Sequence, residues 1–165
     1  IVARVHLLNS LGYNVMVSDY TRYFSLRAYF RQFTQLQIGI VLGMVNVKQI
    51  FDESFYRGVE GGILEAFGKL FPDNTRLFIY PEIDEDGQVS EFTNVKVPEH
   101  LRFLYRHLLE NDFLHGIECS DPSLLNIFSR KLLKQVASGK GDWQKSLPEG
   151  VAEEIIKNKF FGYRG

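Results

Sequence analysis

The sequence has little cysteine and little tryptophan, and it contains no long apolar run. Among its 165 residues there is one cysteine, Cys119, and one tryptophan. A single cysteine excludes an internal disulfide and the cysteine-rich zinc patterns. No apolar run approaches the roughly 20 residues that a membrane-spanning helix needs, and the first residues show no signal-peptide pattern. We therefore expect a cytoplasmic protein that makes no contact with a membrane.

Apolar and aromatic residues are abundant, and the charge is unevenly distributed. Apolar residues make up 45% of the chain, which is enough for a sizeable core. Residues 1–50 carry five Arg or Lys against one acidic residue, whereas residues 51–100 carry four against eleven. One interpretation is that this asymmetry steers a charged partner or supports self-association. The alternative is that the two charged segments are unrelated surfaces exposed to solvent.

Apolar segments with turn signals on both sides alternate with amphipathic segments. Residues 1–12 have helical periodicity and end at a glycine. Short apolar runs at 13–18, 36–42 and 75–81 are typical of buried strands. Helical patterns separate these runs, and strands joined by helices form parallel sheets. The sequence thus predicts an α/β fold, a Rossmann-like three-layer α/β/α arrangement with a mainly parallel sheet.

The C-terminal third reads as helical. Residues 98–165 contain amphipathic helical patterns with their own start and stop signals, among them Asp121 as an N-cap and Gly139 as a C-terminal stop. We interpret residues 1–165 as a single α/β domain, with 98–165 as a helical extension packed on it. Because a helix that feeds a parallel strand usually follows another strand, we also expect a C-terminal fragment of a longer chain.

Candidate ligand residues follow the predicted strands. Ligands of open α/β sheets bind beyond the carboxyl ends of the strands, where this chain has Asp19, Gly43, Asn46 and Glu82. In a dinucleotide-binding fold, an acid in the position of Asp19 accepts hydrogen bonds from ribose hydroxyls. In an ordinary α/β protein, the same residue caps the following helix. Gly43 would allow close approach of a ligand, and Glu82 is the candidate catalytic acid or base.

A second candidate is the segment YRGVEGG. Arg57, Gly61 and Gly62 combine a cation with a glycine-rich helix start, where backbone amides can hold an anion. Glu60 lies beside the glycines and would repel phosphate, and the pattern is not a P-loop. A structural turn is the alternative interpretation.

Other chemistries are not favoured by the residues present. The four histidines lack the spacing of a helical zinc site, so we assign no metal ligand. The stretch DEDG at 84–87 lacks the further ligands of a calcium loop and is typical of a solvated turn, including the turn of a hairpin. Nucleic-acid binding is disfavoured because the net charge is −1 rather than basic.

Two functional hypotheses follow. The first is a domain of a larger intracellular enzyme that binds a nucleotide or a related phosphorylated small molecule; the sequence indicates no more specific cofactor. The alternative is a non-catalytic interaction or oligomerisation domain, which forms a homo-oligomer or contacts a region preceding residue 1. The aromatic tail 158–165 favours the alternative, since exposed Phe160 and Phe161 would be costly unless they are covered.

Overall fold

A computed structural model describes residues 1–165 except 73, 84–86 and 91. The predicted turn at 84–87 therefore lies mostly outside the described residues. The chain divides into two compact units. Residues 19–120 form one, which we call the sheet unit, and residues 1–18 together with 121–165 form the other, which we call the helical unit.

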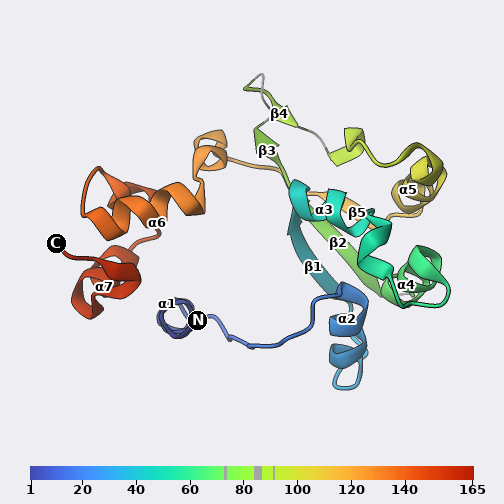
Figure 1. Cartoon of the computed structure of the whole chain (residues 1–165), viewed down its shortest axis with the longest axis horizontal. Helices are drawn as coiled ribbons and strands as arrows, with labels where there is room; N and C mark the ends of the chain where they lie inside the picture. Colours follow the sequence, from blue (N-terminus) through green and yellow to red (C-terminus); the bar gives the residue numbers. More distant parts are fainter. Residues whose placement is uncertain (73, 84–86, 91) are drawn as a thin grey trace. The chain divides into compact units, whose positions relative to one another are not determined.

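The sheet unit is built on three parallel strands. Strands β1 (Ile38–Gly43), β2 (Thr75–Tyr80) and β5 (Leu114–Gly116) are hydrogen-bonded in the order β1-β2-β5. The register pairs Gly43 with Tyr80 and Ile79 with Gly116, so all three strands end at the same edge (Figure 1). A short antiparallel pair, β3 (Glu82–Ile83) and β4 (Val89–Ser90), follows β2 at that edge.

Helices pack against one face of this sheet. The α-helices of the unit are α2 (Tyr23–Arg31), α3 (Met44–Ile50), α4 (Gly62–Leu70) and α5 (Arg102–Glu110), and the 3-10 helices are η1 (Glu53–Tyr56), η2 (Phe92–Asn94) and η3 (Glu99–Leu101). Helix α3 lies against β1 and β2, and α5 lies against β5. The core brings apolar residues of α3, α4 and α5 onto the strands, with Val47, Phe51 and Leu77 completely buried.

The opposite face of the sheet, which we call the outer face, is more open. In β2, Thr75, Leu77 and Ile79 are buried, and the residues between them are only partly buried. The outer face carries Val41, Phe78, Tyr80 and His115, with Val41 66% exposed and the Phe78 ring stacked on His115. This one-sided burial differs from the usual parallel sheet, which is covered on both faces.

The helical unit has a smaller core around the single tryptophan. Its elements are α1 (Val2–Ser10), η4 (Pro122–Asn126), α6 (Ser129–Ser138), η5 (Trp143–Ser146), α7 (Val151–Asn158) and η6 (Phe160–Gly162). Trp143 is 1% exposed and packs with Leu7, Val136, Val151 and Ile155. Phe160, Phe161 and Tyr163 pack against this core, so the aromatic tail covers its own unit.

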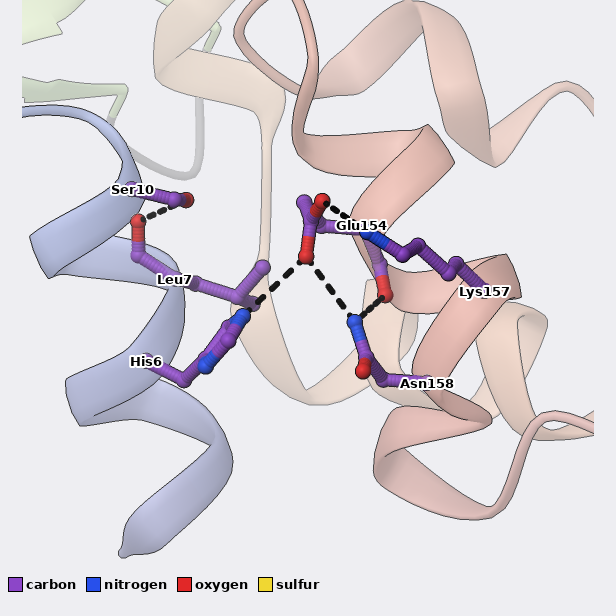
Figure 2. A network of polar contacts seen from close by, with 6 residues as sticks. All are labelled: His6, Leu7, Ser10, Glu154, Lys157 and Asn158. Atoms are coloured by element: carbon purple, nitrogen blue, oxygen red, sulfur yellow. Dashed lines mark hydrogen bonds and ion pairs between the residues drawn. The ribbon is translucent and has the colours of Figure 1, made fainter.

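A polar network joins α1 to α7 within the helical unit. The His6 Nε2 and Glu154 Oε2 atoms are 3.1 Å apart, and Asn158 Nδ2 donates to the same carboxylate at 2.9 Å (Figure 2). Lys157 completes the network on the other oxygen of Glu154. Leu7, the neighbour of His6, is the residue of α1 that enters the core. The network therefore supports the orientation of α1 in which the Leu7 side chain is buried.

The sequence-based fold class is confirmed at the level of an α/β protein with a parallel sheet. The strands expected at 36–42 and 75–81 are β1 and β2. The strand expected at 13–18 is wrong: the structure describes all of these residues and gives them no strand. Tyr13 and Val17 are exposed there, because an apolar run becomes a strand only where a partner strand accepts its hydrogen bonds. Asp121 does cap a helix, but it is the 3-10 helix η4.

Within the described residues, no helix combines the length and the apolar character that crossing a bilayer requires.

Candidate functional site

The carboxyl edge of the sheet brings together two of the predicted ligand positions. Gly43 ends β1 beside Tyr80, the last residue of β2, and Glu82 opens β3 two residues later. Pro81 separates β2 from β3 and prevents the ladder of β2 from continuing, because it has no amide to donate. Gly43 and Glu82 therefore lie at the same sheet edge, as the strand-end rule predicts.

A cleft of about 330 Å³ opens at this edge, and we call it the sheet-edge cleft. Its walls come from α3, from the β3–β4 pair and from the chain that follows it. The lining residues are Met44, Lys48, Glu82, Ser90, Asn94, Val95 and Lys96. This volume lies within the range of roughly 300–1,000 Å³ that is usual for ligand pockets. Buried Met44 and Val95 supply an apolar floor, and the remaining residues are polar.

Among the described residues that line the cleft, the charged groups are two lysines and one carboxylate. Lys48 Nζ donates to Glu82 Oε1 at 2.9 Å, and this pair joins α3 to β3. Both side chains are partly exposed, so the pair is weak and open to exchange with a ligand. Lys96 adds a second cation to the same walls. An ammonium binds phosphate or carboxylate oxygens, and a carboxylate accepts hydrogen bonds from hydroxyl groups.

Polar atoms of the hairpin complete the cleft. Ser90 Oγ donates to the Glu82 carbonyl at 3.2 Å, which fixes β4 against β3 beside the carboxylate. Asn94 lies in η2 and contributes an amide that can both donate and accept. The cleft can therefore hold a molecule that has an anionic group and one or more hydroxyl groups.

Asn46 lies near the cleft but serves the packing of the helices. Its Nδ2 atom donates to the Tyr23 hydroxyl at 2.9 Å, which ties α3 to α2. It is not the cap of the helix, as its place in the sequence suggested, because α3 begins at Met44 with Gly43 in the N-cap position. A Cβ atom added to Gly43 would meet nothing within 4 Å, so the space beside this strand end is free.

Asp19 does not lie at a strand end. It is exposed in the irregular chain before α2, whose N-cap position is occupied by Arg22. The expectation that Asp19 ends a strand is wrong, as is the alternative that it caps the helix directly. The residue is four positions before Tyr23, the first residue of α2, too early to satisfy the first amides of the helix as an N-cap does.

Arg57, Gly61 and Gly62 form a separate group and do not line the sheet-edge cleft. The Arg57 carbonyl accepts from Arg22 Nη2 at 3.0 Å. The Gly61 amide donates to Glu65 Oε2 at 2.7 Å, so the chain's own carboxylate occupies the predicted anion position. Hydrogen bonds from Lys69 and from this amide lower the pKa of Glu65. The left-handed φ of 57° at Gly62 explains the glycine in structural terms.

A second, smaller cavity of about 70 Å³ lies among α2, α3, η1 and α4. Phe24, Phe55 and Tyr56 line it, and Tyr56 donates its hydroxyl hydrogen to the Ile50 carbonyl at 2.7 Å. Burial raises the pKa of Tyr56 from 10.0 to about 12. The phenol is thus neutral and engaged in packing at physiological pH, and the cavity is too small for a nucleotide.

The lysines of the cleft were not predicted from the sequence. Lys48 follows Met44 by one helical turn, so it was detectable once α3 was placed after Gly43. Ser90, Asn94 and Lys96 come after the turn that the sequence predicts at 84–87, but no local pattern indicates which side chains beyond that turn line the cleft. Elsewhere in the described part of the chain, no three His, Cys, Asp or Glu residues gather in a way that could hold a metal ion.

No family model, curated protein or solved structure matches the chain.

Proposed function

We propose that residues 19–120 form a Rossmann-like domain that binds a nucleotide or a related phosphorylated small molecule in the sheet-edge cleft. The observation that carries the proposal is the coincidence of Lys48, Lys96 and Glu82 in one cleft at the carboxyl edge of a parallel sheet. That edge is where open α/β sheets bind their ligands. The proposal extends to a role as part of a larger enzyme.

The charges of the cleft suggest how the ligand is held. Lys96 and Lys48 would bind the phosphate, since both ammonium groups line the cleft. Glu82 would accept a hydrogen bond from a sugar hydroxyl when the ligand competes with Lys48 for it. Glu82 is also the proposed acid or base. Gly43 lies at the same sheet edge but is not among the residues that line the cleft.

The proposal assigns no ligand contact to the other predicted residues. The ribose role of Asp19 depended on a strand end at residue 18, which the chain does not have. Arg57, Gly61 and Gly62 lie outside the cleft, and Asn46 is engaged with Tyr23.

A titration of the whole chain with ATP, AMP and inorganic phosphate tests the proposal, with thermal stability and isothermal calorimetry as readouts. We expect Lys96→Gln to weaken AMP binding by about tenfold, which corresponds to the loss of one charge-assisted contact. Lys69→Gln is the matched control, because Lys69 is an exposed lysine of the same unit outside the cleft. Glu82→Gln should weaken the binding of AMP more than the binding of inorganic phosphate.

The absence of any stabilisation at millimolar concentrations of all three probes would exclude the proposed site. Equal affinities for the Lys96→Gln and Lys69→Gln variants would show that binding takes place elsewhere.

The alternative function, a non-catalytic interaction or oligomerisation domain, is favoured by the outer face of the sheet. Val41 is exposed there beside Phe78, on a face that parallel sheets normally cover. If this face pairs with a second copy of the chain, the wild type is a dimer by light scattering and Val41→Lys is a monomer. A wild-type monomer at high concentration would exclude pairing of two copies through the outer face.

A further inference from the structure

The helical unit has a cleft of its own at the end of the chain. It has a volume of about 520 Å³ and is lined by Ile156, Lys159, Tyr163, Arg164 and Gly165. We call it the tail cleft. It shares no residue with the sheet-edge cleft, and its lining comes from the end of α7 and the aromatic segment that follows.

The backbone beneath the tail cleft has an unusual conformation. Lys159 and Phe161 have φ angles of 51° and 55°, in the left-handed region that residues with a Cβ atom rarely adopt. For a bulky residue such as Phe161 this conformation is strained. Residues held in this way cluster at ligand sites, where the surrounding packing imposes the conformation.

Aromatic packing is what holds the strained segment here. Phe160 lies edge-on to His6 with ring centroids 5.3 Å apart, and Tyr163 lies edge-on to Trp143 at 5.7 Å. Phe161 also packs against the core of the unit. Because the aromatic side chains turn toward the core, the two cations of the segment, Lys159 and Arg164, remain exposed and line the cleft.

The lining combines two cations with an apolar wall. Lys159 and Arg164 are the charged side chains among the lining residues. A guanidinium presents a planar fork of donors that matches phosphate, and an ammonium adds a compact charge. Ile156, which is 41% exposed, and the Tyr163 ring supply apolar surface beside them.

We propose that the tail cleft binds the phosphate group of a small organic phosphate, with Arg164 and Lys159 on the phosphate and with Ile156 and the Tyr163 ring against the apolar part. This site is independent of the nucleotide site proposed for the sheet unit. Inorganic phosphate offers the same charge without the apolar part, so it should bind more weakly than phenyl phosphate.

The single tryptophan allows the tail cleft to be observed separately. Trp143 is buried in the helical unit and contacts Tyr163, so its fluorescence reports on the tail cleft. We would titrate the whole chain with phenyl phosphate and with inorganic phosphate, exciting at a wavelength that tryptophan alone absorbs. The expected result is a saturable fluorescence change with phenyl phosphate that Lys96→Gln in the sheet-edge cleft does not alter.

Two variants test the assigned residues. Lys159→Asn removes the cation but keeps a residue type that tolerates the left-handed conformation, and Arg164→Gln removes an exposed guanidinium. Each variant should lower the affinity for phenyl phosphate by about five- to tenfold, the usual range for the loss of one charge-assisted contact near solvent. Lys134→Gln is the control, since Lys134 is an exposed lysine of α6 outside the lining.

Failure of phenyl phosphate to change the Trp143 fluorescence at millimolar concentration would overturn the proposal. It would also be overturned if Lys159→Asn and Arg164→Gln bind as tightly as Lys134→Gln. Equal affinities for phenyl phosphate and inorganic phosphate would contradict the assignment of Ile156 and Tyr163. None of these outcomes bears on nucleotide binding by the sheet unit.

Discussion

The sheet unit and the helical unit bury their apolar residues in different ways. In the sheet unit, three strands and several helices each contribute buried residues to a shared core. In the helical unit, the core is formed by Leu7, Val136, Trp143, Val151 and Ile155, and aromatic residues of the tail close it. A core with few members depends more on each of them. The two units should therefore respond differently to loss of a single side chain.

The largest difference should follow from Trp143→Ala. Removing a fully buried aromatic side chain typically costs about 3–5 kcal/mol, which is comparable to the whole stability of a small core. We expect the helical unit to lose its structure while the sheet unit keeps its own. Hydrogen exchange would show α7 amides unprotected and β2 amides protected. Protection that is lost equally from both units would show that they unfold together.

Leu77→Ala is the corresponding change in the sheet unit. Leu77 is 0% exposed in the central strand, so we expect a cost of about 2–5 kcal/mol. Because its core is larger, the sheet unit of this variant should still fold, but its denaturant midpoint should be lower than that of the wild type. Circular dichroism during denaturant titration would measure the midpoint. Leu77→Ile, which conserves volume, serves as the control and should cost about 1 kcal/mol. Complete unfolding of the sheet unit by Leu77→Ala would contradict the greater tolerance that we assign to it.

Alkaline pH should destabilise the sheet unit through its buried tyrosines. Burial raises the pKa values of Tyr56 and Tyr105 from 10.0 to about 12. Between these values the unfolded state releases a proton that the folded state keeps, so the free energy of unfolding falls as pH rises from 10 to 12. The double variant Tyr56→Phe/Tyr105→Phe should show a shallower decline in urea titrations. An unchanged slope would contradict the assignment.

The smallest effect should come from the network in Figure 2. The hydrogen bond with His6 is the main cause that lowers the pKa of Glu154 from 4.5. The stability that this carboxylate contributes is therefore present above pH 4.5 and is lost as pH falls through the lowered pKa. Glu154→Gln should make the helical unit less dependent on pH in this range, with Glu153→Gln as the control. Thermal scans from pH 3 to 6 would measure the difference.

The parts of the fold that the sequence predicted are those with a clear periodicity and a partner. Ile63, Phe67 and Leu70 recur at helical spacing, and they form the buried side of α4. The run at 13–18 has the same apolar character as β1, but strand formation depends on a neighbouring strand that is remote in sequence. Strand β5 is only three residues long, which is too short for a pattern of alternation to be seen.

The candidate site was predictable only where it depends on strand ends. Glu82, which lines the cleft, was proposed because it follows β2. Gly43 was proposed because it ends β1, and it lies at the same sheet edge without lining the cleft. Lys96 was not found, since it reaches the cleft through the path of the chain after β4 rather than through any local pattern. The Gly61 amide was predicted to bind an anion, and it binds the side chain of Glu65. The sequence therefore indicated the hydrogen-bond donor, but it did not show that the acceptor would be the Glu65 side chain and not a ligand.

The division of the helical unit into two segments has a consequence for the order of folding. Residues 1–18 leave the ribosome before residues 19–120, and their partners in 121–165 are made only after the whole sheet unit. Helix α1 has nine residues, and isolated helices of that length are marginal in water. We expect α1 to stay unfolded until α7 is available, which pulse-labelling hydrogen exchange during refolding would detect as late protection of Leu7. Joining α1 to α7 closes a loop that contains all of residues 19–120, and the entropic cost of closure rises with loop length.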